Sequence, residues 1–330
     1  MPTPTYVIGH PEAMLVAVHL EERHGVRVAG SFDPLGPVWT PGSPVDRPLP
    51  AEPFVVLNGS GNFHHETLPL LEKVLRGMEG ELAYVQIDAH PDTRPMFRWF
   101  VDCTSFVGRV LENKRVRSVH LLGQFPECIT DPGQKGPIAD RLTYFRCDYF
   151  AKFHQYVAGQ NPRTERYSPS YPEIEASARR NPAIRRLRKT RTKSPEGELV
   201  DGLLVDWLGL EAFDAETLPD LPVYLTVDLD VAKDRPVTDW RRKAQKGDGK
   251  LTPNQGEIPF AEMIALIEAI GRKRRIIGAD VCGLIERTTW LSDPILEDSL
   301  EAVAETHAAL VRAIESRGQG APAPVARSPS

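Results

Sequence analysis

The stretch ELAYVQIDAHPDTRP, residues 81–95, places three ionisable side chains directly after an apolar run. Residues 82–87 are mostly apolar and predict a buried strand, and Asp88, His90 and Asp92 follow at its end. Alternate side chains of an extended segment share one face, so Asp88 and His90 can present ligands to one point. Burying charge is costly unless it is compensated, so this stretch predicts a buried strand that leads into a site with a compensating partner.

The composition is that of a globular protein that can bury a large core. The chain has 330 residues, is 41% hydrophobic and carries a net charge of -5, which provides no global attraction to nucleic acid. It contains no apolar run long enough to cross a membrane, and the start MPTPTYVIGHPEAM lacks the pattern of a secretory signal. Four cysteines without a C-x-x-C pair indicate neither a disulfide framework nor a zinc site. We therefore expect a cytoplasmic protein without a membrane partner.

Strand-like and helix-like segments alternate along the chain. Continuously apolar strands are predicted at 54–59, 82–88, 116–123, 222–230 and 274–284. Helical spacing of apolar residues is found between them, in the segments 68–78, 103–113, 259–273 and 294–316. Buried strands that alternate with helices are typical of a parallel sheet covered on both faces. We predict an α/β protein with three α/β/α layers around a central, mostly parallel sheet.

One segment departs from this alternation. Residues 158–200 are basic and interrupted by prolines, and we interpret them as an insertion at the surface. The low-complexity tail at 319–330 is expected to be disordered. We predict a single catalytic domain over 1–318.

Three segments place possible metal ligands after predicted buried strands. They are NGSGNFHHET (58–67), QIDAHPD (86–92) and LTVDLDV (225–231). Ligands of parallel sheets gather at the carboxyl ends of strands, so these segments are expected to meet. Unpaired carboxylates brought together would repel each other, and one or two divalent cations resolve that conflict. Ligation rich in oxygen favours Mn²⁺, with zinc, iron or magnesium as alternatives.

These motifs resemble those of the arginase and agmatinase superfamily of binuclear manganese hydrolases, the ureohydrolases. The family's D-A-H-x-D motif is complete at 88–92, and its S-x-D-x-D motif stands at 226–230 with Thr226 in place of serine. Its G-G-D-H motif is looser here, where GNFHH offers His64, with His65 as the alternative. The resemblance runs from about residue 54 to 285 and implies an arginase-like fold.

The resemblance also implies a metal centre and an activity. It implies two Mn²⁺ per chain, bridged by Asp88 and Asp228, with His64 and Asp92 completing one site and His90 and Asp230 the other. Such a centre would hold a bridging hydroxide that hydrolyses a linear C–N bond of a guanidino or amidine group. Asp92 would also transfer the proton to the leaving amine. The substrate would be a small molecule or a guanidino group on a peptide, and the protein would be a homo-oligomer.

The substrate-binding positions differ from the family pattern. The family's D-x-x-E motif, whose glutamate holds the guanidinium, has Asp280 here but Gly283 in place of the glutamate. Glu286 is a candidate substitute. Arg94 could accept a substrate carboxylate in bidentate fashion, and Arg98 could line the mouth of the site. The alternative for both arginines is an ordinary solvated or capping position.

No clear counterpart of the arginase proton-shuttle histidine is found. The corresponding loop offers Asp102 and Cys103 as catalytic candidates, with packing as the alternative for the cysteine. His120 lies within a predicted strand, where a satisfied core histidine is the commoner role.

Two other functions fit part of the sequence. Deacetylases share the arginase fold with a single zinc and lack a ligand of the His64 type. A binding protein could use the basic segment 179–193 to hold nucleic acid or an acidic partner, but that run has no aromatic residues for base stacking.

Overall fold

A computed structural model describes most of the chain outside the basic segment and the C-terminal tail. The described residues are 2–40, 45, 47–50, 53–93, 100–124, 141–146, 154–157, 184–193, 199–207, 210–235, 256, 258–284 and 293–316. Arg94, Arg98 and Glu286 lie outside these ranges, as do the disordered tail predicted at 319–330 and most of the basic insertion.

Eight parallel strands form the central sheet. In chain order they are β1 (Thr5–Ile8), β2 (Val28–Phe32), β3 (Val55–Gly59), β4 (Leu82–Ile87), β5 (Val116–Gln124), β6 (Leu142–Arg146), β10 (Val223–Asp228) and β11 (Ile276–Cys282). The order across the sheet is β2-β1-β3-β11-β10-β4-β5-β6, and each of these pairings is parallel. Every residue of β3, β4 and β10 is buried, as the continuously apolar sequence predicts.

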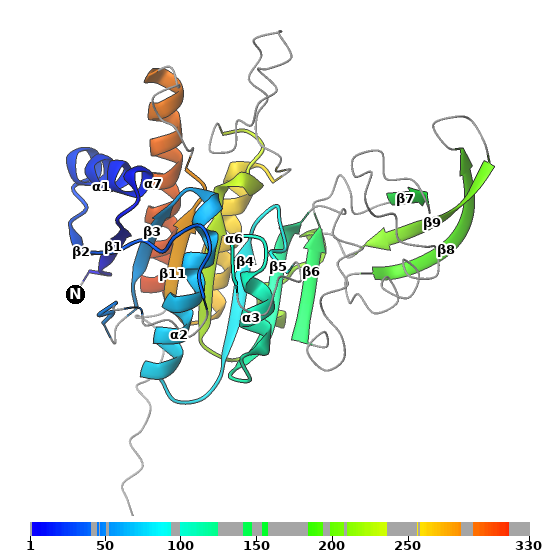
Figure 1. Cartoon of the computed structure of the whole chain (residues 1–330), viewed down its shortest axis with the longest axis horizontal. Coiled ribbons are helices and arrows are strands. Elements are labelled where there is room, and N and C mark those ends of the chain that lie inside the picture. Colours follow the sequence, from blue (N-terminus) through cyan, green and yellow to red (C-terminus); the bar gives the residue numbers. More distant parts are fainter. Residues whose placement is uncertain are drawn as a thin grey trace, which may run out of the picture.

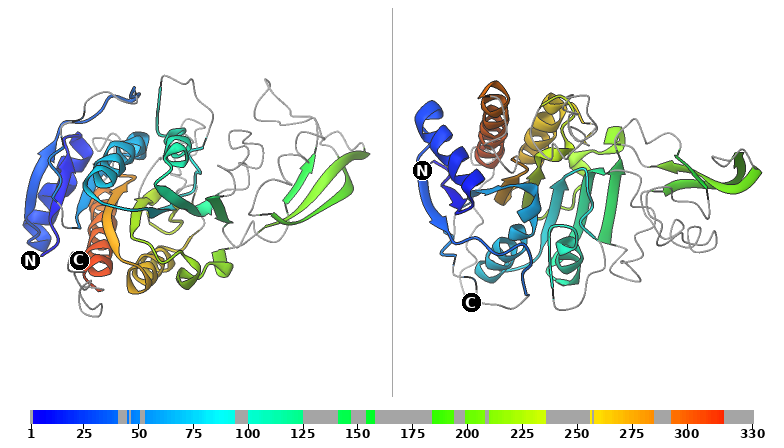
Figure 2. Two further views of the ribbon diagram at one scale, coloured as in Figure 1. Left: turned by 90° about the horizontal axis from the view of Figure 1, so that it is seen from below. Right: turned by 45° about the horizontal axis from the view of Figure 1, so that its top comes forward.

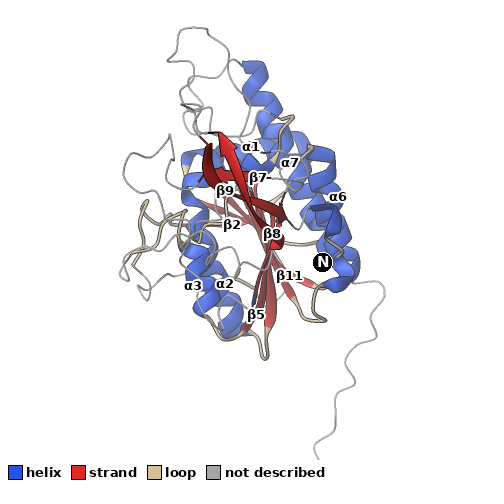
Figure 3. Ribbon diagram, turned by 90° about the vertical axis from the view of Figure 1, so that its right-hand side faces the viewer, coloured by secondary structure: helices blue, strands red, loops and turns tan. Residues whose placement is uncertain are grey.

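Helices cover both faces of this sheet (Figures 1 and 3). One layer holds α2 (Thr67–Gly77) and α3 (Phe106–Glu112), and the other holds α1 (Pro11–His24), α6 (Phe260–Lys273) and α7 (Asp293–Glu315). Two hydrophobic clusters fill the spaces between the layers, one on each face of the sheet. The three-layer architecture and the parallel sheet predicted from the sequence are confirmed.

Short 3₁₀ segments follow two of the central strands where the predicted ligands lie. After β3 the chain enters η1 (Gly61–Glu66), and after β10 it enters η6 (Leu229–Val231). Two further segments of this kind, η4 (Leu210–Ala212) and η5 (Ala215–Thr217), lie before β10. η1 and η6 both begin at the carboxyl ends of strands of the central sheet. Their side chains therefore meet at one edge of that sheet.

A second, smaller sheet follows β6 in the chain. It consists of β7 (His154–Val157), β8 (Ile184–Lys193) and β9 (Leu199–Trp207), paired antiparallel in the order β7-β9-β8. Figure 2 shows this sheet beyond one end of the central sheet, and the α1–β2 unit at the opposite end. Part of the predicted basic surface insertion is therefore a strand, which the sequence interpretation did not anticipate. Among the described residues, no helix is both long enough and apolar enough to span a membrane.

Candidate metal centre

The three predicted ligand segments meet at the carboxyl edge of the central sheet. The strands β3, β11, β10 and β4 are consecutive neighbours there, and η1, Asp88 and η6 follow three of them. The structure brings together all six residues that the resemblance implied as metal ligands: His64, Asp88, His90, Asp92, Asp228 and Asp230.

His64 lies at the middle of one half of this cluster. Its Nδ1 is 3.1 Å from Asp88 Oδ2, 3.2 Å from Asp92 Oδ2 and 3.7 Å from Asp228 Oδ2. The imidazole is 1% exposed, yet Nδ1 makes no hydrogen bond with these oxygens or with any other described atom. A buried nitrogen that faces several carboxylate oxygens without a hydrogen bond is the arrangement expected of a metal ligand.

The second half of the cluster contains His90. Its Nδ1 lies 2.7 Å from Asp230 Oδ2 and 3.7 Å from Asp88 Oδ1, and its side chain is 45% exposed. Asp88 is therefore shared, with one oxygen near His64 and the other near His90. The ligand atoms of His64, Asp88 and Asp92, and those of Asp88, His90 and Asp230, form two groups that are each compact enough for one ion.

A hydrogen-bond chain behind His64 sets its tautomer. Asp280 accepts a hydrogen bond from Thr226 Oγ1 at 2.7 Å, and Tyr224 and Thr67 also donate to its carboxylate. Because the Thr226 hydroxyl proton is used in this bond, Thr226 Oγ1 accepts from His64 Nε2 at 2.8 Å. A neutral His64 with a proton on Nε2 directs the lone pair of Nδ1 toward the carboxylates, as a metal ligand must.

The electrostatics of the centre also fit divalent cations. Burial raises the pKa of Asp228 well above its usual value, and Asp230 and Asp88 raise it further. Burial and the charge of Asp92 raise the pKa of Asp88 in the same way. These carboxylates repel one another in a site with little water, so a cation that stabilises their ionised forms would relieve the conflict.

The backbones of two glycines approach the carboxylate of Asp228 closely. A Cβ at Gly61 would lie 2.6 Å from Asp228 Oδ2, and a Cβ at Gly283 would lie 2.5 Å from Asp228 Oδ1. Gly283 also has a φ of +103°, which side chains rarely tolerate. The glutamate that the family carries at this position has no room here, so Gly283 follows from the packing around Asp228.

Asp92 adopts an unusual backbone conformation. Its φ of +49° lies in the left-handed region, which is sparsely populated by residues other than glycine, asparagine and aspartate. Gln86 Nε2 donates to Asp88 Oδ2 at 2.6 Å and to Asp92 Oδ2 at 3.3 Å, and so links the two carboxylates. The left-handed backbone and the bond from Gln86 together position the Asp92 carboxylate.

His65 does not share the position of His64. Its Nε2 lies 2.9 Å from the carbonyl oxygen of Gly36, and burial lowers its pKa. Among the described residues, His65 belongs to none of the compact ligand groups. The geometry favours His64 over the alternative left open by the sequence.

The two catalytic candidates in the loop before α3 have other surroundings. Asp102 Oδ1 accepts hydrogen bonds from Ser105 Oγ at 2.7 Å and from both the amide and the hydroxyl of Thr104, which forms the turn into α3. Burial, followed by the charges of Asp92 and Asp102, raises the pKa of Cys103 to about 12. The hydrogen bonds of Asp102 support a structural role for this residue, and the raised pKa of Cys103 makes its thiol a poor nucleophile.

The sequence interpretation missed Cys282 as part of the centre. Its sulfur forms a compact group with ligand atoms of His64 and Asp228, and the residue is 2% exposed. The available signal was its position in the predicted strand two residues after Asp280, since residues at this spacing share a face. Gln86 and Asp88 have the same spacing and share a face in the same way.

A buried ion pair anchors the segment that carries His64. Glu66, the last residue of η1, pairs with Arg47 and lies 3.2 Å from His10 Nε2, and its side chain is fully buried. It also accepts from the amide of Leu35 at 2.6 Å. Burial raises the pKa of Glu66, but His10 and Arg47 lower it by more, so the net pKa is below its usual value.

Comparison with known proteins gives similarity to solved structures alone. No family model and no curated protein matches the chain. Proclavaminate amidino hydrolase from Streptomyces clavuligerus is 15% identical, with 94% of this chain and 92% of that chain covered and a TM-score of 0.49. Formimidoylglutamase from Bacillus subtilis is 12% identical, with 95% and 87% covered and a TM-score of 0.47. Helicobacter pylori arginase is 10% identical, with 95% and 100% covered and a TM-score of 0.48.

Proposed function

We propose that this chain is a metal-dependent hydrolase of linear C–N bonds with two metal sites, of the ureohydrolase type. The observation that carries the proposal is the shared carboxylate of Asp88, whose two oxygens face His64 and His90 in two compact ligand groups. A single ion does not require two such groups. This arrangement supports a binuclear centre over the mononuclear zinc site of a deacetylase-like enzyme.

The proposed ligand sets follow the observed groups. His64 and Asp92 would hold one ion, His90 and Asp230 the other, and Asp88 and Asp228 would lie between them. Oxygen ligands predominate, which favours Mn²⁺. The thiol of Cys282 is a softer donor within reach of the first ion, and it increases the affinity expected for zinc, cobalt or iron.

The cations and the residues of the centre would have different roles in hydrolysis. Two divalent cations, when bound, lower the pKa of a water enough for it to act as a nucleophile near neutral pH. Asp92, held by its left-handed backbone conformation and by Gln86, would accept a proton and return it to the leaving amine. The Asp280–Thr226 pair keeps His64 in the tautomer that leaves Nδ1 free to bind.

The proposed substrate carries a guanidino or amidine group, either in a small molecule or on a peptide. Residue 283 is a glycine and contributes no carboxylate, and a Cβ at this position would lie 2.5 Å from Asp228 Oδ1. Recognition of the cationic group therefore depends on another residue, for which Glu286 is the proposed candidate, while Arg94 and Arg98 are proposed to receive an acidic part of the substrate. A homo-oligomer and a cytoplasmic location stay predictions from the sequence.

The substitution Asp230→Ala tests the proposal. We expect it to abolish hydrolysis and to remove at least one metal ion per chain, because His90 loses its nearest partner at 2.7 Å. The measurements are elemental analysis after manganese loading, and ammonia and urea release from guanidino and amidine compounds and from arginine-containing peptides. Circular dichroism checks that the fold is kept.

The control for this test is Asp220→Ala, which removes an exposed carboxylate before β10. It should bind metal and turn over like the parent chain. Unchanged turnover in Asp230→Ala would refute the assignment of the site, and one zinc per chain with deacetylase activity would favour the mononuclear alternative.

A further inference from the structure

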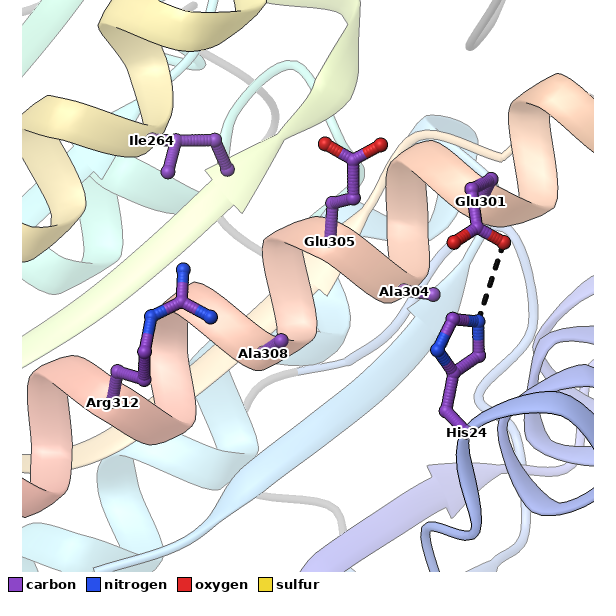
Figure 4. Close-up of a pocket in the computed structure, with 7 residues that line it drawn as sticks. All are labelled: His24, Ile264, Glu301, Ala304, Glu305, Ala308 and Arg312. Atoms are coloured by element: carbon purple, nitrogen blue, oxygen red, sulfur yellow. Dashed lines mark hydrogen bonds and ion pairs between the residues drawn. The ribbon is translucent and has the colours of Figure 1, made fainter.

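A second group of metal-type ligands lies between the first and the last helix of the described chain. His19 Nε2 is 3.1 Å from Glu301 Oε2, and His24 Nε2 is 3.2 Å from the same oxygen. His19 and His24 both belong to α1, and Glu301 belongs to α7. Figure 4 shows the imidazole of His24 directed at the carboxylate of Glu301 beside a pocket.

We propose that His19, His24 and Glu301 form a binding site for one divalent transition metal of the zinc class. The three ligand atoms lie within 4.8 Å of one another. Metal–nitrogen and metal–oxygen bonds of about 2.1 Å place neighbouring ligands of a tetrahedral zinc about 3.4 Å apart. The two observed nitrogen–oxygen separations are close to that edge length, so small adjustments of the side chains would admit an ion.

The ligand types select the kind of metal. Two imidazoles and one carboxylate suit zinc, nickel or cobalt, whereas magnesium and calcium prefer oxygen ligands throughout. In the absence of an ion, both histidines donate Nε2–H to Glu301; to bind an ion they must present Nε2 lone pairs instead. The site therefore competes with protons, and its affinity should fall as the pH is lowered.

A pocket borders two of the three proposed ligands. A pocket of about 270 Å³ is lined by His24, Glu301, Ala304 and Ala308, among others. The side chain of His24 is 33% exposed and that of Glu301 is 40% exposed, whereas that of His19 is 6% exposed. The buried histidine would hold the ion against the protein, and the pocket would supply a water or an added ligand as the fourth donor.

This group is separate from the carboxylate centre. His24 is the last residue of α1, and His10, which precedes that helix, contacts Glu66 next to the ligand segment. With a rise of 1.5 Å per residue, His24 lies about 20 Å along the helix from that contact. An ion held by both helices would stabilise the packing of α1 on α7.

The test measures zinc binding in a full-length chain whose carboxylate centre is disabled by His64→Ala and Asp88→Ala, which remove at least one member of each compact ligand group of that centre. We expect equilibrium dialysis with metal analysis to find one zinc per chain. Adding His24→Gln or Glu301→Gln should weaken that binding by at least about tenfold, since even outer-shell partners contribute that much to metal affinity. The matched control is Glu297→Gln, one turn earlier on α7, where the acid pairs with Arg23 at 3.7 Å and should not affect zinc.

A second measurement uses the parent chain and does not depend on the disabled background. Zinc added to the manganese-loaded protein should raise its melting temperature, and His24→Gln should abolish most of that rise. The proposal is overturned if the disabled chain binds no zinc, or if it binds zinc equally well with and without His24→Gln. Because neither readout is hydrolysis, the outcome is independent of the function proposed for the carboxylate centre.

Discussion

At the scale of single residues, the orientation of His64 determines what the centre can bind. Its Nε2–H is used by Thr226, which in turn donates to Asp280, and its Nδ1 faces three carboxylates. A histidine is a metal ligand only through an unprotonated nitrogen. The Thr226–Asp280 pair therefore has a positioning role in the proposed centre.

Replacing Thr226 by valine tests this role. Thr226→Val keeps the shape of the side chain but removes the acceptor for His64 Nε2–H, so we expect metal affinity to fall by about 10- to 100-fold. Isothermal titration with Mn²⁺ measures the change. Thr217→Val, at an exposed 3₁₀ segment, is the control and should leave the affinity unchanged. Equal affinity in Thr226→Val and the parent would exclude the positioning role.

Cys282 provides a spectroscopic test at the same scale. If its sulfur ligates the first ion, cobalt-loaded protein should show a near-ultraviolet charge-transfer band that is typical of thiolate coordination. Cys282→Ser should lose the band while retaining cobalt, and Cys103→Ser should keep it, because Cys103 belongs to no compact ligand group of the described residues. A band that persists in Cys282→Ser would remove this cysteine from the ligand set.

At the scale of elements, the short segment η1 depends on a buried ion pair. Glu66 at its end pairs with Arg47, which is 1% exposed, and the Arg47 guanidinium also donates to the carbonyl oxygen of Glu66 at 3.3 Å. Such a pair matters mainly because removing one partner leaves the other charge buried without compensation.

We therefore expect Glu66→Ala to lower the free energy of unfolding by about 3–5 kcal/mol. Urea denaturation at pH 7 measures the change. Glu72→Ala, one helical turn into α2 with a side chain 32% exposed, should change stability by about 0.5 kcal/mol or less. A loss in Glu66→Ala no larger than that of Glu72→Ala would mean that η1 is held by other contacts.

Elements buried on both faces of the sheet were predictable, and elements at its periphery were not. The continuously apolar strands β3, β4, β5, β10 and β11 lie where the sequence predicts them, and so do α6 and α7. The edge strand β2 reads VAGSF and alternates between partly buried and exposed residues, so it has no such signal. The strand β8 is basic and has no apolar pattern in its sequence. It is identified as a strand by its pairing with β9.

At the scale of the whole molecule, buried neutral histidines link stability to pH. His307 on α7 lies 2.8 Å from Thr5 Oγ1 on β1, and burial, with a smaller contribution from His24, lowers its pKa to about 4. The unfolded chain binds a proton at this residue below a pH of about 6.5, whereas the folded chain does not. Proton binding to the unfolded chain at His307 therefore leaves the free energy of unfolding unchanged above that value. It lowers this free energy progressively as the pH falls toward 4.

For His307 alone, we expect a loss of about 2 kcal/mol in the free energy of unfolding between pH 7 and pH 5. His307→Gln removes the titrating group, so its stability should depend less on pH over this range. Urea denaturation at the two pH values, with EDTA present to exclude metal effects, measures the difference. Equal losses in His307→Gln and the parent chain would show that this histidine does not titrate as described.

The sequence by itself determined the layered α/β architecture and the three segments that carry the candidate ligands. Continuous apolar runs require burial on both faces of a strand, and carboxylates placed directly after such runs must lie at the carboxyl edge of the sheet. Both inferences use neighbours along the chain, and the residues His64, Asp88, His90, Asp92, Asp228 and Asp230 do meet at that edge.

Only the tertiary structure decided which side chains from distant segments share one space. The choice of His64 over His65, the place of Cys282 beside Asp228 and the lack of room at Gly283 follow from the packing of β3, β10 and β11 against one another. The pairing of α1 with α7 likewise brings His19 and His24 to Glu301 across about 280 residues of sequence. Such contacts depend on strand order and register, which no local pattern of residues specifies.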